Sequence, residues 1–186
     1  MAYYGIKRRV FISHYRGDRA EVDAFIDRFA NTEGVFTPYV LGANDNDDFI
    51  DSNNTAYVMR RIREKYLQDT TVTIVLVGSC THSRRYVDWE LKSSLTQGDY
   101  TPNGVMGIIL PSQGSSANLP DRLAANWTKG HNNCYARYWV YPSDANTLGS
   151  WVDDAYEART SRAHLINNPQ DMMRYNQRCK VCGVTH

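Results

Sequence analysis

The sequence predicts an α/β domain with a flavodoxin-like five-stranded parallel sheet and helices on both faces. Two observations support this prediction. Short apolar runs alternate with longer amphipathic runs through most of the 186 residues, as in successive strand–helix–strand units. One run, residues 72–77, is apolar at nearly every position, which is typical of a central parallel strand covered by helices on both sides.

The elements before residue 70 follow from local signals. The β-branched and aromatic residues at 9–13 predict the first strand. Asp18, with Glu21 three residues later as its capping-box partner, is expected to begin the first helix. Residues 35–41 form the second strand, which Pro38 places at a sheet edge. The second helix is predicted from apolar residues at helical spacing, namely Tyr57, Met59, Ile62, Tyr66 and Leu67.

The second half of the chain repeats the same alternation. After the central strand at 72–77, Ser83 is the expected N-cap of a third helix that runs to about Gln97. A buried fourth strand at 105–110 stops at Pro111. The remaining expected elements are a short helix at 120–126, a fifth strand at 135–141 and a helix from Asp144 to about Arg162.

Composition and charge describe a soluble globular chain. Hydrophobic residues make up 42% and charged residues 22%, and no window approaches the roughly 20 apolar residues that a membrane span needs. The first ten residues lack the apolar core of a secretory signal. We therefore expect a cytoplasmic protein without a membrane partner, and the net charge of +1 argues against a nucleic-acid partner.

The near-neutral total hides a division of the chain into two parts. Residues 159–186 contain five basic residues and one acidic residue, a net charge of +4, so the preceding residues are acidic on balance. This shift predicts a domain over residues 1–162 and a basic C-terminal tail over residues 163–186, which contains a Cys-x-x-Cys pair.

The four cysteines are Cys80, Cys134, Cys179 and Cys182. In a cytosolic chain they are expected to be reduced thiols. Cys179 and Cys182 have the spacing of a zinc knuckle, but only Cys80, Cys134 or histidines are available to complete a metal site. We assign no metal ligand from the sequence and leave metal binding by the pair open.

Ligands of open parallel sheets bind beyond the carboxyl ends of the strands. No G-x-G-x-x-G and no P-loop follows a strand here. The third helix offers a candidate instead, because Glu90 lies in its early turns, between Tyr86 and Trp89, after the central strand. The position of Glu90 around the helix axis, beside the sheet-facing side, predicts a partly desolvated carboxylate at the boundary between core and solvent. The structural alternative is a glutamate that only stabilises the helix N-terminus.

Three segments of the chain resemble the TIR-like domain family, most closely the TIR proteins of the bacterial Thoeris antiphage system. Residues 8–15 (RRVFISHY) resemble its first strand and loop, and residues 71–79 (TVTIVLVGS) its third strand. Residues 83–91 (SRRYVDWEL) resemble the helix with the catalytic glutamate. In enzymatic members a tryptophan precedes that glutamate by four positions, where this chain has Tyr86. The resemblance covers roughly residues 7–160.

The resemblance implies the TIR form of the fold and NAD as a substrate, cleaved at the nicotinamide–ribose bond, with no further cofactor. It places Glu90 at the catalytic position. The residues that it implies for substrate binding are Phe11, Ser13, His14, Tyr15, Arg16, Asp48, Ser83, Tyr86 and Trp89.

The same resemblance implies a role in signalling. The product is expected to be a cyclic ADP-ribose isomer or an ADP-ribose conjugate, made on phage infection, that activates a separate effector protein. Two alternatives stay open at this point. The chain is a non-enzymatic TIR scaffold that self-associates, with the acidic loop 42–54 meeting the basic tail of another copy, or it is a relative of the nucleoside deoxyribosyltransferases. We list a homo-oligomer among the partners that the protein could have.

Overall fold

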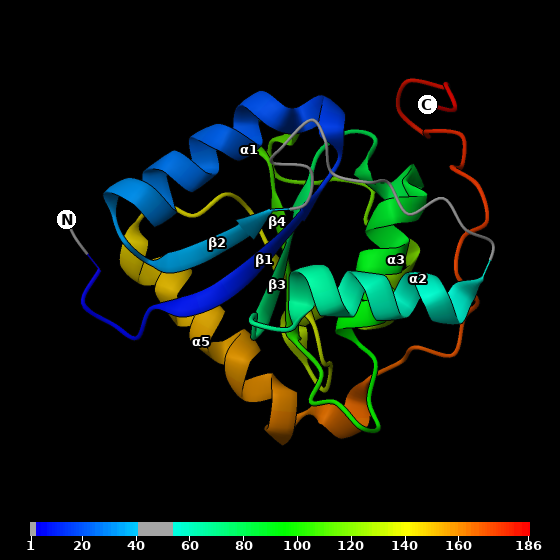
Figure 1. The fold of residues 1–186 in the computed structure, drawn as a ribbon. Helices are drawn as coiled ribbons and strands as arrows, with labels where there is room; N and C mark the ends of the chain where they lie inside the picture. The colour runs from blue at the N-terminus through cyan, green and yellow to red at the C-terminus, as the bar shows by residue number, and fades with distance from the viewer. Residues whose placement is uncertain (1–2, 41–53) are drawn as a thin grey trace.

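The computed structural model describes residues 3–40 and 54–186 and contains a five-stranded, all-parallel sheet (Figure 1). The strand order is β2-β1-β3-β4-β5, which is the flavodoxin-like order. The predicted fold is therefore confirmed, with β3 in the centre and the proline-containing β2 at an edge. The strands are β1 (Arg8–His14), β2 (Phe36–Val40), β3 (Val72–Val77), β4 (Gly104–Ile109) and β5 (Arg137–Trp139).

The helices occupy the predicted places with shorter bounds. They are α1 (Arg19–Ile26), α2 (Thr55–Ile62), α3 (Arg85–Ser94), α4 (Asp121–Ala125) and α5 (Ala145–Ser161). Turns of wider, π-type helix prolong α1 over Asp27–Thr32 and α2 over Arg63–Leu67. None of the helices in the described ranges is long and apolar enough to cross a membrane.

Asp18 occupies the N-cap position of α1 as predicted, but its side chain makes no capping bond, and the predicted N-cap Ser83 is wrong because Arg84 takes that position. Asp18 precedes α1, but its carboxylate accepts a hydrogen bond from the Thr81 hydroxyl at 3.3 Å instead of capping the helix. Glu21 accepts from the backbone N–H of Ser112 at 2.9 Å. Ser83 donates to the Cys80 carbonyl at 2.8 Å, and α3 begins one residue later. These side chains connect loops at the carboxyl edge of the sheet, which local sequence patterns do not reveal.

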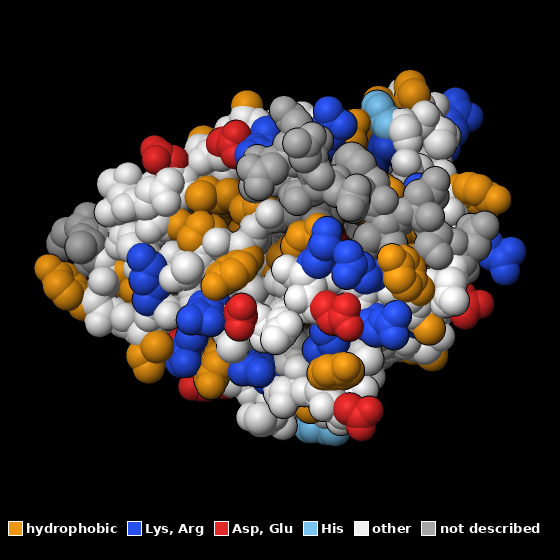
Figure 2. All heavy atoms as spheres, viewed as in Figure 1, with side chains coloured by type: hydrophobic (Ala, Val, Ile, Leu, Met, Phe, Trp, Pro, Cys, Tyr) orange, Lys and Arg blue, Asp and Glu red, His pale blue; other side chains and the backbone are white. Residues whose placement is uncertain are grey.

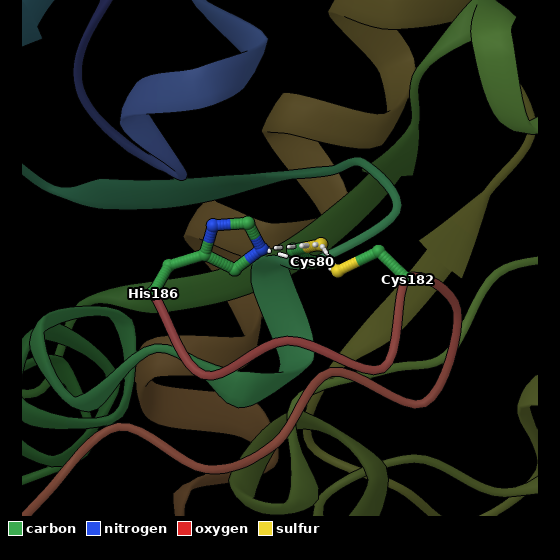
Figure 3. A group of neighbouring side chains, drawn as sticks. All are labelled: Cys80, Cys182 and His186. Carbon is green, nitrogen blue, oxygen red and sulfur yellow. Dashed lines mark hydrogen bonds between the residues drawn. The ribbon is translucent and has the colours of Figure 1, made fainter.

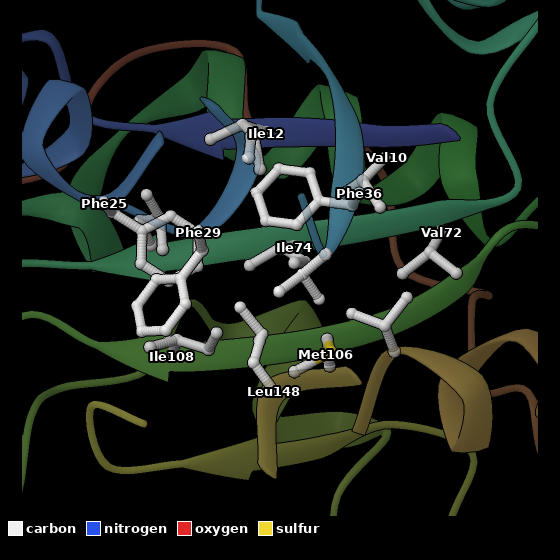
Figure 4. Packing of buried hydrophobic residues seen from close by; sticks show 14 of the residues in the cluster. Val10, Ile12, Phe25, Phe29, Phe36, Val72, Ile74, Met106, Ile108 and Leu148 are labelled. Atoms are coloured by element: carbon white, nitrogen blue, oxygen red, sulfur yellow. The ribbon is translucent and has the colours of Figure 1, made fainter. Parts of the chain in front are cut away.

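One face of the sheet packs against α1 and α5. Alternate residues of the strands point to this side, among them Val10 and Ile12 of β1, and they meet Phe25 of α1 and Leu148 of α5 (Figure 4). The opposite residues of the same strand, Phe11 included, point to α2 and α3. The period of two along β1 therefore determines which side chains can reach α3.

The second face carries a third layer besides α2 and α3. Residues 167–186, which we call the C-terminal segment, contain no helix or strand, yet they run along α3 and the outer side of α2 (Figure 1). The Met173 carbonyl accepts from the Trp89 indole of α3 at 2.8 Å. Met172 packs on the apolar cluster formed by Phe11, Val58, Ile62, Leu67 and Trp89. Part of the predicted basic tail thus packs against α3 and the apolar cluster beside it.

The face of the molecule seen in Figure 2 mixes charges of both signs, with Lys and Arg side chains next to Asp and Glu. Exposed ion pairs of the protein include Arg60 with Glu64 and Arg9 with Asp69. Exposed pairs of this kind contribute at most about 1 kcal/mol each to the free energy of unfolding.

Candidate active site

The candidate site lies where β1 and β3 are neighbours, the point at which the strand order of the sheet reverses direction. Ser13 near the carboxyl end of β1 donates a hydrogen bond to Glu90 of α3, with 2.5 Å between Ser13 Oγ and Glu90 Oε2. Both side chains are buried, Ser13 completely and Glu90 to within 4% of its surface. Residues 77 positions apart are thereby joined at the place where such folds bind ligands.

Glu90 is buried more deeply than predicted, because the expectation of a boundary position considered only the sheet-facing side of α3. The opposite side of the helix is covered by α2 and by the C-terminal segment, so Asp88 and Trp89 are buried as well. The Glu90 carboxyl therefore lies inside the protein and accepts a hydrogen bond from the Ser13 hydroxyl.

The environment of Glu90 opposes ionisation. Burial raises its pKa from 4.5 to about 8, although the hydrogen bond from Ser13 works in the opposite direction. The resting site at neutral pH is therefore mostly a protonated carboxylic acid. The protonated Glu90 carboxyl would lose its proton readily when a cation binds beside it, because an adjacent positive charge lowers the pKa of an acid.

Tyr86 and Trp89, the aromatic residues predicted around Glu90, pack against each other on α3. Trp89 is buried and Tyr86 half-buried, with their ring centroids 5.1 Å apart in an edge-on arrangement. The Arg85 guanidinium lies 5.0 Å from the centre of the Tyr86 ring and 5.1 Å from that of Trp89. Arg85, Tyr86 and Trp89 thus form a cation–π cluster at the N-terminal end of α3.

A cavity of about 450 Å³ opens beside Trp89. Its described lining residues are Thr55, Val58, Trp89, Asp171, Met172, Met173, Arg174 and Tyr175. Glu90 and Ser13 are not among them. More than half of these lining residues belong to the C-terminal segment, which sequence reasoning had not connected with the site.

The loop after β1 supplies three more predicted residues. His14 is half-buried at the end of the strand, and burial lowers the pKa of its imidazole, which therefore stays neutral at pH 7. The Tyr15 ring lies under the Arg84 guanidinium at 4.3 Å, and Arg16 is exposed. The loop thus offers a neutral ring, an aromatic face and an exposed cation near the carboxyl edge of the sheet.

The other predicted binding residues have different surroundings. Phe11 is completely buried and packs against Tyr66 with 6.4 Å between ring centroids. Ser83 is also completely buried, and its carbonyl accepts from the backbone of Gln177. Asp48 and the rest of the predicted acidic loop up to residue 53 lie outside the described residues.

Sequence reasoning missed the ion pair that fastens the C-terminal segment to α3. Arg122 of α4 contacts Asp88 through two hydrogen bonds of 2.8 and 3.3 Å, and both side chains are buried. Arg122 also donates to the Gln170 and Asp171 carbonyls, while Asp88 accepts from the Met173 backbone at 2.8 Å. These residues are far apart in the sequence and meet only in the folded protein. Their contacts could therefore not be predicted from sequence spacing.

The fold and the buried pair define a class of protein, a flavodoxin-like α/β domain with a carboxyl group at its switch point. Comparison with known families is consistent with that class: the model of the family described as Thoeris protein ThsB, TIR-like domain, matches residues 11–115. Since the match covers more than half of the chain, the protein belongs to this family of TIR-domain defence proteins. No curated protein matches the chain.

Proposed function

We propose that this protein cleaves the nicotinamide–ribose bond of NAD and that Glu90 is its catalytic residue. The observation that supports the proposal is the buried Glu90–Ser13 pair at the switch point of a TIR-like fold. A carboxyl group without a neighbouring cation is costly to keep inside a protein, and such groups concentrate at functional sites.

The bond between ribose C1′ and the nicotinamide nitrogen breaks with both electrons leaving on nicotinamide. Positive charge then develops on the ribose, as in other glycosidic cleavages. A carboxylate in a water-poor site stabilises this charge more strongly than it would in water. Glu90 supplies that carboxylate, and the cationic pyridinium ring of bound NAD favours its ionisation. Ser13 holds the carboxyl group in place through its 2.5 Å hydrogen bond.

The cleaved ribose must then bond to an acceptor, which loses a proton to Glu90 or to solvent. Water as acceptor gives ADP-ribose, a nitrogen or oxygen of the same molecule gives a cyclic isomer, and a second metabolite gives a conjugate. If the ribose reacts beside the buried Glu90 carboxyl, the site would exclude bulk water and favour another acceptor. We propose that the product is a nucleotide signal for a separate effector protein.

Purified protein incubated with NAD tests the activity directly. We expect free nicotinamide to accumulate, measured by chromatography, with extract from phage-infected cells added as an activator in a parallel reaction. A panel of deoxynucleosides run beside NAD tests the deoxyribosyltransferase alternative. Release of free base from deoxynucleosides without cleavage of NAD would contradict the proposal.

The raised pKa of Glu90 predicts the pH dependence of the reaction. If the carboxylate is the active form, kcat/KM should rise with pH through about 8, the pKa of the free enzyme. Initial rates at limiting NAD between pH 6 and pH 9 measure this profile. A rate that is flat or falls across this range would show that ionisation of Glu90 is not required.

Replacement of Ser13 by alanine should move that profile. The Ser13 hydroxyl lowers the pKa of Glu90, so Ser13→Ala raises it further and shifts the rise of kcat/KM to higher pH. The variant therefore loses most activity at neutral pH and recovers part of it under alkaline conditions. An equal loss of rate at every pH would assign Ser13 a different role.

A further inference from the structure

A cluster of metal-binding side chains lies on the loop after β3, outside the Glu90 site. Cys80 from this loop meets Cys182 and His186 from the C-terminal segment (Figure 3). Cys80 Sγ is 3.4 Å from Cys182 Sγ and 3.6 Å from His186 Nε2, and the latter two atoms are 3.1 Å apart. Three potential ligands from positions up to 106 residues apart therefore converge on one point.

A fourth thiol lies next to the cluster. Cys179 is almost fully buried, and its thiol donates to the carbonyl of Ser79, the residue before Cys80, at 3.5 Å. A tight turn joins it to Cys182, since the Gly183 N–H donates to the Cys179 carbonyl at 2.9 Å. Gly183 has a φ of 72°, which glycine adopts without strain. The turn thus holds both cysteines of the Cys-x-x-Cys pair on the side facing Cys80.

We propose that Cys80, Cys179, Cys182 and His186 form a structural zinc site. Tetrahedral zinc holds sulfur at about 2.3 Å and nitrogen at about 2.0 Å, so ligand atoms of such a site lie roughly 3.5–3.8 Å apart. The separations among Cys80, Cys182 and His186 are close to these values, and Cys179 completes the set once its thiol turns from the Ser79 carbonyl toward them. Three cysteines and one histidine, with two cysteines separated by two residues, form one of the common ligand sets of structural zinc.

The surroundings of the cluster supply a compensating charge. Three thiolates, a neutral imidazole and Zn²⁺ carry a net charge of −1. The Arg84 side chain is buried beside them, donating to the Cys80 carbonyl at 3.2 Å and to the His186 carbonyl at 3.2 Å. Its Nη2 atom is buried without a hydrogen-bond partner among the described residues. A buried cation with a free donor can hydrogen-bond to the thiolates of an anionic zinc site and balance their charge.

The zinc ion would connect the C-terminal segment to the loop after β3, at the carboxyl edge of the sheet. His186 lies against Tyr15 with 5.6 Å between ring centroids, and the Cys179 thiol donates to the Ser79 carbonyl. The loops after β1 and β3 are therefore both held at this point. Because zinc thiolates form only when the thiols lose their protons, binding is coupled to the folding of the segment.

Metal analysis of the untagged full-length protein, purified under reducing conditions without chelator, tests the proposal. We expect about one zinc per chain by mass spectrometry of the elements, and cobalt substitution should give the absorption of tetrahedral thiolate coordination. Cys182→Ser and His186→Ala should each weaken zinc binding by more than about tenfold. Both residues are exposed, so these changes leave the core intact.

Two matched variants serve as controls. Cys134→Ser changes a cysteine outside the cluster, and His164→Ala changes another exposed histidine; both should keep one zinc per chain. Limited proteolysis adds a second measurement, because zinc removal should expose the C-terminal segment to cleavage. A reduced protein that takes up no zinc, or equal zinc loss in the control variants, would overturn the proposal.

Discussion

Replacing Glu90 by glutamine should abolish NAD cleavage and at the same time stabilise the protein. Loss of the carboxylate removes the group that stabilises positive charge on the ribose, and we expect nicotinamide release to fall at least about a thousandfold. Glutamine has nearly the same shape and can still accept the Ser13 hydrogen bond, so the fold should remain intact. Nicotinamide release and thermal unfolding of the same preparation measure both effects.

The gain in stability follows from the pKa of Glu90. Between pH 4.5 and about 8 the unfolded chain ionises Glu90 while the folded chain keeps the proton, so the free energy of unfolding falls as the pH rises through this window. Below the window both states are protonated and the penalty disappears. Glu90→Gln removes the penalty, which is about 3 kcal/mol at pH 7. The expected rise in Tm is about 5–10 °C.

The pH dependence of this gain separates it from an unrelated change in packing. The difference in Tm between the two proteins should be small at pH 5 and large at pH 8. Glu157→Gln on the exposed side of α5 is the matched control and should change neither activity nor Tm. A Glu90→Gln variant that keeps the parent rate would refute the catalytic assignment, and an equal Tm would refute the raised pKa.

Replacing Asp88 by asparagine should give the largest loss of stability. The change leaves the Arg122 guanidinium, of which 2% is exposed, inside the protein without its carboxylate. Breaking a buried ion pair from one side costs about 3–5 kcal/mol. We therefore expect Tm to fall by about 10 °C or more, and the C-terminal segment to become accessible to protease because Asp88 also holds the Met173 backbone.

An exposed pair provides the comparison. Asp23→Asn breaks the contact with Arg19 at the surface of α1 and should cost less than about 1 kcal/mol. The double variant Asp88→Asn with Arg122→Met should recover part of the stability lost in Asp88→Asn, because no unpaired charge remains buried. If Asp88→Asn costs no more than Asp23→Asn, the pair does not anchor the segment.

The fold could be predicted because its signals are local. Each strand is a short apolar run, each helix has apolar residues at helical spacing, and their alternation leaves few topologies. The position of Glu90 after the central strand was predicted for the same reason. How deeply Glu90 is buried could not be predicted, because the burial of α3 depends on the C-terminal segment. The 20 residues of that segment form no helix or strand and show no periodicity.

The parts of the site that escaped prediction depend on contacts over long sequence separations. The Arg122 side chain reaches Asp88 from 34 residues away and Asn168 from 46. The Cys-x-x-Cys pair was visible in the sequence, but only the fold shows that Cys80 and His186, rather than Cys134, stand beside it. Spacing rules find ligands on one element and cannot choose partners across the fold.

Mass spectrometry of nucleotides from phage-infected cells tests the central claim most directly. Cells that express the parent protein should lose NAD on infection and gain nicotinamide together with an ADP-ribose-derived nucleotide. Cells that express Glu90→Gln at the same level should keep their NAD, whereas cells with Glu157→Gln should behave like the parent. Unchanged NAD in all three, or the same new nucleotide with Glu90→Gln, would contradict catalysis by the buried Glu90–Ser13 pair.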